Sequence, residues 1–568
     1  MRNVKKFSLA MVSMLLVFQL TLGMSFAKEQ EEDWGKDGHG NLQTLVKGSP
    51  IHGANGIAFH NGLLYIASVF GSEIVVMNPY SGQIVKRLGQ EYGVQTPDDL
   101  VFGPDGSLYW TSLFTGEVGK LAPDGVTHSI VATNLPGANA IAFTRDFKRL
   151  FVSADFFGNG LYEIDPTGAN TTPIDILKFP EYGVPNVAGE MNAMAFGADG
   201  YLYGPMYNKG RVVKVNVATK EITTVLELPQ PGINPAAVKF DSQERLNIVT
   251  SNPNQVIRLN LHNMQQEVLA NPVSGIDNLA FDSHGRLFIS DASGGSISEI
   301  LKNKQLREVS PAGMMAAGGV AVLPGKDGHD RVFVADFWTL RQYDGKSGTP
   351  KPLGKFTSAV QPMTVAPFGD KLVWTSINGN AVQIWDPVTK QVVQDYRDFA
   401  GPTNAIEFRG NLVVAEIGTG KVVMQNPAEV RTVLTTIQGI PFGLASNDKE
   451  LYAADWYSGL IYKLAEGGTI IAKPNPILNG HQFSQPEGLA LERDGHLLVV
   501  EVGAGRLSRV DLKTGTITTV VDKLQIGAWL PLLPPTTFFN GVAVGHSGTI
   551  YLTADKANAL YRIRGDND

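Results

Sequence analysis

One short phrase returns along almost the entire chain. It reads "GANAIAF" at Gly137 to Phe143, "GEMNAMAF" at Gly189 to Phe196 and "GIDNLAF" at Gly275 to Phe281. In these copies an Asn or Asp precedes the last apolar residue by four positions. That last position gives twelve markers along the chain: Phe59, Phe102, Phe143, Phe196, Phe240, Phe281, Val322, Pro367, Phe408, Ser446, Leu491 and Val544. The markers are about 44 residues apart on average, which predicts a fold built from repeated units.

The interior of each copy predicts strands rather than helices. Between Gly56 and Leu88 the runs "GIAFHNG", "LLYIASV", "EIVVMNP" and "QIVKRLG" are short, rich in β-branched or aromatic residues, and separated by turn residues. Four strands in a unit of this length are typical of a propeller blade. Propellers usually have four to eight blades. The twelve copies therefore predict an all-β chain of two tandem six-bladed β-propellers, with twelve four-stranded blades in total.

Two additional strand-like segments bear on the domain boundary. They are "LQTLVKG" at Leu42 to Gly48 and "QLREVSP" at Gln305 to Pro311. Each could complete the last blade of the ring that follows it, which predicts a first propeller over residues 42–303 and a second over 304–568, divided near Asn303. In the alternative, the second segment is the fourth strand of the sixth unit, and the N-terminal segment closes the twelfth unit.

The N-terminus has the pattern of a secretory signal. Arg2, Lys5 and Lys6 precede an apolar run from Phe7 to Leu22, and "MSFA" then supplies small residues for cleavage. We therefore expect a signal peptide over residues 1–27, a flexible polar leader over 28–41, and a secreted, extracellular protein. The alternative is an uncleaved anchor, although the run is short. No second apolar stretch is long enough to span a membrane.

Composition excludes several classes of function. The formal net charge is −7, which argues against a nucleic-acid partner because the phosphate backbone attracts a basic surface. The chain has no cysteine, so disulfides, thiolate metal sites and cysteine nucleophiles are excluded. No G-x-S-x-G motif indicates a serine hydrolase.

Oxygen-bearing residues recur in one register of the first ring. Four positions before each marker the chain has Asn55, Asp98, Asn139, Asn192, Ala236 and Asp277, and Asp99 and Asn278 follow two of them. The first strand of each blade lines the central channel of a propeller, so these side chains should converge. Carboxylates away from bulk water need a counter-charge. A hard cation, Ca²⁺ first and Mg²⁺ or Mn²⁺ next, would supply it, with Asp98, Asn192, Asp277, Asn55, Asn139 and Asn278 as candidate ligands. The alternative is that these are ordinary turn residues bonded to their own backbone.

The second ring has fewer oxygen-bearing residues in this register. Its residues are Gly318, Met363, Asn404, Phe442, Glu487 and Asn540. We expect this ring to be mainly structural, with a weaker candidate site around Glu487, Asn540 and Asn404.

Several phrases resemble a known family. "PDDLVFGPDGSLYWTS", "GIDNLAFDSHGRLFISD", "PEGLALERDGHLLVVE" and "FNGVAVGHSGTIYLTAD" are similar to the regucalcin/gluconolactonase family and, more distantly, to the paraoxonases. The resemblance implies six-bladed propellers, one per half of the chain, with a divalent cation in the channel. It matches Asp98, Asn192 and Asp277 to the family's acidic, Asn and Asp ligands. Ala236 stands where the family has a second Asn, and Asn234 could substitute.

The resemblance also implies a metal-dependent hydrolase of small lactones or esters. Asp277, by analogy with the family, or Asp99, by proximity, would take the proton from the attacking water. His52 is an alternative base, although a turn contact explains it equally. Two other functions stay open: a non-catalytic propeller that binds a ligand or protein, with loop aromatics such as Phe156, Phe157, Trp338 and Trp456 as contacts, and a lyase of a cyclic ester, which would need a basic residue opposite the ion.

Overall fold

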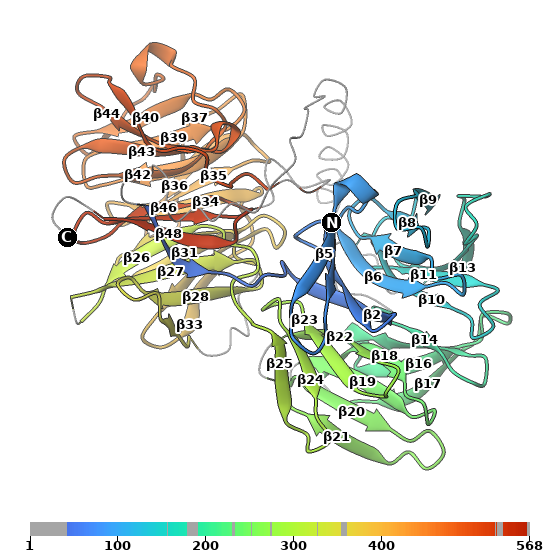
Figure 1. Ribbon diagram of the computed structural model, residues 1–568. Coiled ribbons are helices and arrows are strands. Elements are labelled where there is room, and N and C mark those ends of the chain that lie inside the picture. The colour runs from blue at the N-terminus through green and yellow to red at the C-terminus, as the bar shows by residue number, and fades with distance from the viewer. Residues whose placement is uncertain are drawn as a thin grey trace. The chain divides into compact units, whose positions relative to one another are not determined.

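The computed structural model (Figure 1) describes residues 42–155, 157–178, 191–229, 233–251, 253–272, 275–326, 328–353, 361–528, 530 and 538–564. The predicted signal peptide, the predicted leader and Phe156 lie outside the described residues. Within them the chain forms twelve four-stranded antiparallel sheets. Its helical elements are short 3₁₀ turns, of which η3 (Tyr207–Lys209) borders the candidate site.

Six sheets form the first unit. Their strands are β2 (Ala54–His60), β3 (Leu63–Ser68), β4 (Glu73–Met77) and β5 (Ile84–Leu88); β6 (Pro97–Phe102), β7 (Leu108–Ser112), β8 (Glu117–Leu121) and β9 (His128–Ala132); β10 (Ala138–Phe143), β11 (Leu150–Ala154), β12 (Gly160–Ile164) and β13 (Ile174–Lys178); β14 (Ala195–Phe196), β15 (Leu202–Met206), β16 (Arg211–Val215) and β17 (Ile222–Glu227); β18 (Asn234–Phe240), β19 (Leu246–Ser251), β20 (Gln255–Leu259) and β21 (Gln266–Ala270); and β22 (Ile276–Phe281), β23 (Leu287–Asp291), β24 (Ile297–Ile300) and β25 (Leu306–Ser310).

The other six sheets form the second unit. Their strands are β26 (Val320–Pro324), β27 (Asp330–Asp336), β28 (Thr339–Asp344) and β29 (Pro350–Lys351); β30 (Thr364–Phe368), β31 (Lys371–Ser376), β32 (Ala381–Asp386) and β33 (Gln391–Tyr396); β34 (Pro402–Phe408), β35 (Asn411–Glu416), β36 (Lys421–Gln425) and β37 (Arg431–Thr436); β38 (Pro441–Ser446), β39 (Leu451–Asp455), β40 (Ile461–Glu466) and β41 (Thr469–Ile470); β42 (Pro486–Leu491), β43 (His496–Glu501), β44 (Arg506–Asp511) and β45 (Ile517–Val521); and β46 (Val542–Val544), β47 (Ile550–Ala554), β48 (Ala559–Ile563) and β1 (Leu42–Lys47).

The first strands of the sheets close each unit into a ring. In the first unit β2, β6, β10, β14, β18 and β22 each contact the next, and β22 contacts β2 again. In the second unit β26, β30, β34, β38, β42 and β46 close in the same way. These two cycles confirm the predicted fold class of two six-bladed propellers, with the first strand of every blade innermost.

The strand pairing corrects the predicted domain boundary. β25 hydrogen-bonds to β24, with Leu306 opposite Ile300, so it is the fourth strand of the sixth blade. β1 instead pairs with β48 and completes the twelfth blade. The first propeller therefore comprises Lys47–Ala316, rather than residues 42–303, and the second is built from β1 up to Val46 and most of the chain after Ala316, including Ala317–Ala528. The reason is local: a short turn brings β25 back to β24, and the edge of β48 is left for the N-terminal strand to cover.

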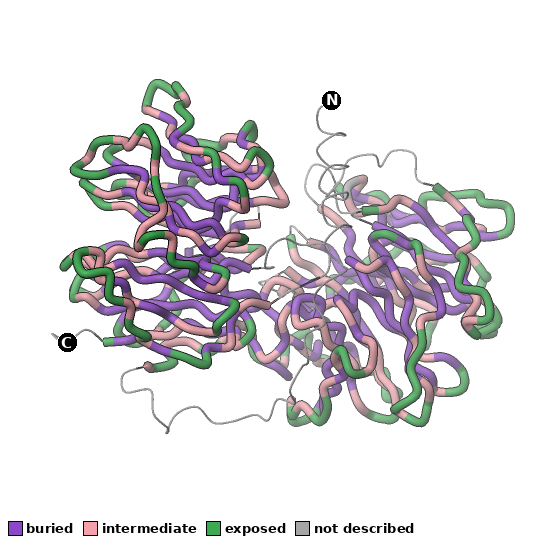
Figure 2. The backbone as a smooth tube through the Cα atoms, turned by 90° about the horizontal axis from the view of Figure 1, so that it is seen from above, coloured by how far each residue is buried: buried purple, intermediate pink, exposed green. Residues whose placement is uncertain are grey.

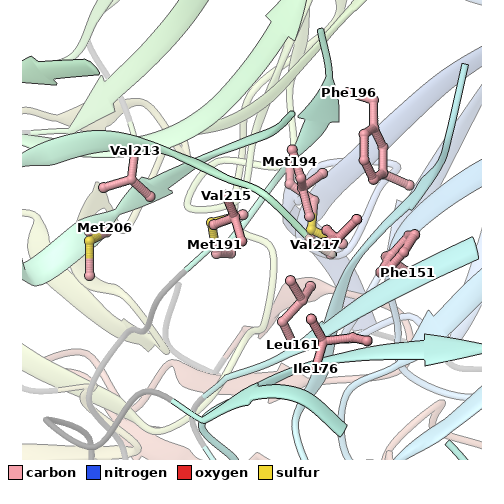
Figure 3. Close-up of a cluster of buried hydrophobic side chains, with 13 residues drawn as sticks. Phe151, Leu161, Ile176, Met191, Met194, Phe196, Met206, Val213, Val215 and Val217 are labelled. Atoms are coloured by element: carbon pink, nitrogen blue, oxygen red, sulfur yellow. The ribbon is translucent and has the colours of Figure 1, made fainter. Parts of the chain in front are cut away.

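Apolar side chains fill the space between neighbouring blades. Strands are largely buried and turns exposed in each unit (Figure 2). Figure 3 shows one such layer, in which Phe151 and Leu161 of the third blade pack with Phe196 and Val213 of the fourth. This packing fixes the position of every inner strand and so the side chains at the channel.

Candidate functional site

A β-bulge lies where the recurring polar residue stands. The pairing of the first and second strands shifts register between Ala54 and Ile57 in the first blade, and at the corresponding places in four of the others. Blades of the second ring have the same irregularity. A bulge bends the strand and redirects its side chains. The bulge is therefore shared by blades of both rings, and the residue types within it distinguish the first ring.

The side chains four positions before the markers of the first ring meet one another; four of them lie in bulges, and Asn192 precedes β14. Asn55 Nδ2 donates to Asp98 Oδ1 at 2.7 Å, and Asn139 Nδ2 donates to Asn192 Oδ1 at 3.0 Å. Asn192 Nδ2 reaches the backbone carbonyl of Ala236, also at 3.0 Å, and Asn192 hydrogen-bonds to the Asp277 carboxylate as well. The structure thus brings Asn55, Asp98, Asn139, Asn192 and Asp277 together from five blades. We call these five residues the channel ring.

Asp99 and Asn278 lie behind the channel ring, at the second bulge position. Asp99 accepts hydrogen bonds from the backbone N–H groups of Leu100 and Ile141, at 2.9 and 3.3 Å. Asn278 donates to Asp99 Oδ1 at 3.3 Å and accepts from its neighbour Leu279 at 2.8 Å. Both side chains are buried and already bonded, which makes them supports of the bulges.

Gly56 makes room for this pair. A Cβ at Gly56 would lie 2.5 Å from both the Cα and Oδ1 atoms of Asp99. Besides Gly56, Asp99 and Asn278, the remaining three blades of the first ring have alanine at this second position: Ala140, Ala193 and Ala237. Small residues recur there because inner strands of neighbouring blades approach closely, and the glycine is what allows the two larger side chains on either side of it.

The carboxylates of the channel ring are costly to ionise. Burial, and then the charge of Asp277, raise the pKa of Asp98 well above its usual value. Burial, and then the charge of Asp99, raise the pKa of Asp277 to about 7. Burial also raises the pKa of Asp99, although the charge of Lys239 opposes the shift. The channel mouth is therefore short of positive charge.

Two buried amide oxygens of the channel ring also favour the binding of a cation. Within the part of the chain that the structure describes, Asn55 Oδ1 and Asn139 Oδ1 have no hydrogen-bond donor. Asn139 is 1% exposed, so water does not satisfy its oxygen from bulk solvent. Oxygen atoms of carboxylates and amides are the ligands that hard cations such as Ca²⁺ prefer, so the channel ring fits such an ion.

The donor set is dominated by amides rather than carboxylates. Asp98, Asp99 and Asp277 do not all approach within 4.8 Å of one another; among the described residues only Glu492, Asp494 and His496, in a hairpin turn, do so. Glu492 is held there by Arg509, with hydrogen bonds of 2.6 and 2.8 Å. A cation in the channel ring would thus take few carboxylates and several amide oxygens.

The sequence did not single out Lys239. It stands directly before the marker Phe240, where the other first-ring copies have Ala58, Val101, Ala142, Ala195 and Ala280. Its ammonium group donates to the carbonyl of Met194 at 3.4 Å. The signal that could have identified Lys239 is a lysine at a position where the other first-ring copies have a small, apolar residue.

His52 makes turn contacts. Its backbone N–H donates to Ser68 Oγ at 3.1 Å, and its carbonyl accepts from the backbone of Phe70, also at 3.1 Å. Burial, and then the charge of Arg87, lower the pKa of His52 to about 4. Asn234, the suggested substitute ligand, begins β18 opposite Ser251.

The equivalent position of the second ring is apolar or satisfied. Phe442 is fully buried and packs on Phe539, with ring centroids 5.4 Å apart. Glu487 accepts both the backbone and side-chain N–H groups of Asn540, at 2.7 and 2.9 Å, and Asn540 Oδ1 accepts from Asp555 at 3.1 Å. These contacts agree with a mainly structural channel in this ring.

Comparisons with known proteins give no family. No protein-family model matches the chain, and no curated protein matches it. A streptogramin B lyase structure is 16% identical over 53% of this chain and 96% of its own, with a TM-score of 0.36. The extracellular domain of a putative one component system from B. thetaiotaomicron is 12% identical over 93% of this chain and 79% of its own, with a TM-score of 0.34. A GH74 xyloglucanase from Xanthomonas campestris is 13% identical over 92% of this chain and 100% of its own, with a TM-score of 0.43.

Such low scores transfer neither an activity nor a site, and the fold assignment comes from the sheets themselves. The resemblance to the regucalcin/gluconolactonase family stays a prediction. Within the described ranges, no helix is long and apolar enough to cross a membrane.

Proposed function

We propose that the first propeller binds a divalent cation in its channel ring and hydrolyses a lactone or ester there, and that the protein does so outside the cell. The observation that carries the proposal is the convergence of five oxygen-bearing side chains, two of whose buried amide oxygens find no donor among the residues that the structure describes. Amide oxygens without a hydrogen-bond donor and carboxylates with raised pKa values together favour the binding of a cation. Ca²⁺ is the first choice, and Mg²⁺ or Mn²⁺ the next.

The residues divide into three roles. Asp98, Asn192 and Asp277, with Asn55 and Asn139, would hold the ion. When bound, the ion would polarise the substrate carbonyl and stabilise the oxyanion that develops there. Asp99 and Asn278 are bonded to backbone and to each other, which supports a structural role for both rather than ligation or catalysis.

Asp277 is the favoured base for hydrolysis. It is only partly buried, whereas Asp99 is 1% exposed. Asp277 would accept a proton from water as the water oxygen bonds to the carbonyl carbon. The bond from that carbon to the ester oxygen breaks, and the proton passes to the departing alkoxide, giving a hydroxy acid from a lactone or an acid and an alcohol from an ester.

A lyase of a cyclic ester is the second candidate. It needs a basic residue near the ion, and the charge of Lys239 acts on Asp99 directly behind the channel ring. The two reactions differ in their products, because hydrolysis adds one water to the substrate and elimination adds none. A non-catalytic scaffold would retain the ion and give neither product.

The test is turnover of a panel of γ-lactones, δ-lactones and aryl esters by the mature chain, with Ca²⁺ or with a chelator, followed by mass spectrometry of the product. We expect calcium-dependent hydrolysis that Asp277→Asn lowers by about 100-fold or more. Glu487→Gln, at the same position in the second ring, should retain activity. Ion binding without turnover of any substrate would favour the scaffold.

A further inference from the structure

The fifth blade supplies no side-chain oxygen to the channel ring, and we call this position the gap. Five of the six residues that stand four positions before the first-ring markers carry a side-chain oxygen, and the sixth is Ala236, which carries only a methyl group. The backbone carbonyl of Ala236 is occupied by Asn192, whose Nδ2 donates to it at 3.0 Å. The fifth blade therefore offers no free side-chain oxygen to an ion at this level.

A hydroxyl pair borders the gap. Tyr207, in η3, packs against the buried cluster that contains Ala193, Ala236 and Ala237, and η3 contacts β18. The Tyr207 hydroxyl lies 2.8 Å from Ser251 Oγ, and Ser251 Oγ lies 3.5 Å from the carbonyl oxygen of Asn234 at the start of β18. Two hydroxyl groups thus lie on the side of the ring where the oxygen is missing.

We infer that the fifth blade is the open side of the ion site, where water or the substrate carbonyl completes the coordination, and that Tyr207 is a substrate-contacting residue there. This inference rests on the proposed ion and hydrolase function. A catalytic metal site keeps one position free of protein ligands, whereas a structural site closes it. The ring supplies that free position through an alanine.

The Tyr207 hydroxyl defines the class of substrate, and Ser251 Oγ, 2.8 Å away, only positions it. The Tyr207 hydroxyl can donate or accept a hydrogen bond. It suits a lactone or ester with a second oxygen close to the carbonyl, such as a ring oxygen or a neighbouring hydroxyl. Asn55, Asn192 and Asp277, the favoured base, are the partly exposed members of the ring.

The experiment measures water on the bound ion and does not depend on turnover. Mn²⁺ is added to the mature chain, and water-proton relaxation counts the exchangeable waters bound to it. The variants are Ala236→Asn and, as the matched control of similar volume without an oxygen, Ala236→Leu. We expect at least one exchangeable water on the wild-type ion, and one fewer on Ala236→Asn than on Ala236→Leu. An equal number of exchangeable waters in the two variants would contradict the inference that the fifth blade is the open side of the ion site.

Tyr207→Phe tests the second half of the inference and keeps it falsifiable if the Ala236 variants do not fold. It should leave Mn²⁺ affinity and the water count unchanged and lower kcat/KM about tenfold, as expected for one lost hydrogen bond. Ser251→Ala, which removes only the partner hydroxyl, should stay within about twofold. Equal losses in both variants would show that the pair is only structural. If the wild-type chain binds Mn²⁺ but turns over no substrate, the proposed hydrolase function is wrong. The water count would then still test whether the fifth blade is the open side of the ion site.

Discussion

At the scale of single residues, the channel ring is a set of acceptors without enough donors. Desolvation raises the pKa of both Asp98 and Asp277, followed by the charge of Asp277 for the first and of Asp99 for the second. The amide oxygens of Asn55 and Asn139 are unpaired among the described residues. The register of the sequence predicted the five residues that meet, but the candidate ligands also included Asn278, whose side chain bonds to Asp99 behind the ring. It could not separate Asp98 from Asp99, because only the coordinates show that Asp99 is used by backbone N–H groups of two blades.

The same residues predict how pH affects the cation-free protein. The usual pKa of Asp is about 3.9, and that of Asp277 in the folded chain is raised to about 7. Between these values the folded chain binds more protons than the unfolded chain, so its stability is highest at the acidic end and falls as the pH rises. Thermal unfolding in a chelator from pH 4 to pH 8 should show this decline, and Asp277→Asn should reduce it.

Calcium should reverse the decline. Because protons and Ca²⁺ compete for the same oxygens, added Ca²⁺ should raise the melting temperature more at pH 7.5 than at pH 5. An equal calcium shift at both pH values would mean that the ion binds elsewhere.

At the scale of elements, the bulge in the inner strand decides which side chains reach the channel. The recurring phrase allowed twelve units and their strands to be predicted, because most blades need an apolar residue at the marker position. It could not reveal the bulge itself, since three blades of the second ring carry the same irregularity with different residues. The sequence did not indicate Lys239, because the residues at the same position in the other first-ring blades are small and apolar. The residue on which its charge acts, Asp99, also lies three blades away.

Gly56→Ala tests the spacing of the bulges. The new Cβ would lie 2.5 Å from Asp99 Cα, so inner strands must shift, and we expect about 2 kcal/mol of lost stability, measured by denaturant unfolding, with weaker ion binding. Gly89→Ala is the matched control, because its Cβ would meet only the flexible Glu91 carboxylate, at 3.0 Å. Similar stability of the two variants would contradict this role for Gly56.

At the scale of the whole molecule, the first propeller is inserted between the first strand and the remainder of the second. β1 completes the blade of β46 to β48, whereas the first propeller closes with its own strands. Sequence could predict that two strands were left over but not which ring each joins. Either pairing satisfies the pattern, and the choice depends on which sheet edge is free.

Separate fragments should show this asymmetry. Residues 47–316 should unfold cooperatively alone. Residues 317–568 lack β1 and should melt about 5 °C or more below the same fragment with Leu42–Lys47 appended through a flexible linker. A shuffled strand is the control. If the appended strand and its shuffled version melt alike, β1 does not stabilise the second propeller.

An ion in the channel of the first propeller is the central prediction, and calcium titration by calorimetry tests it most directly. The mature chain, after chelator treatment, should bind one Ca²⁺ per molecule at the ring. Asp98→Asn with Asp277→Asn should weaken that binding by about 100-fold or more, while Glu487→Gln should bind as the wild type does. Wild-type chain that binds no divalent cation, or a double variant that binds it unchanged, would contradict the central claim.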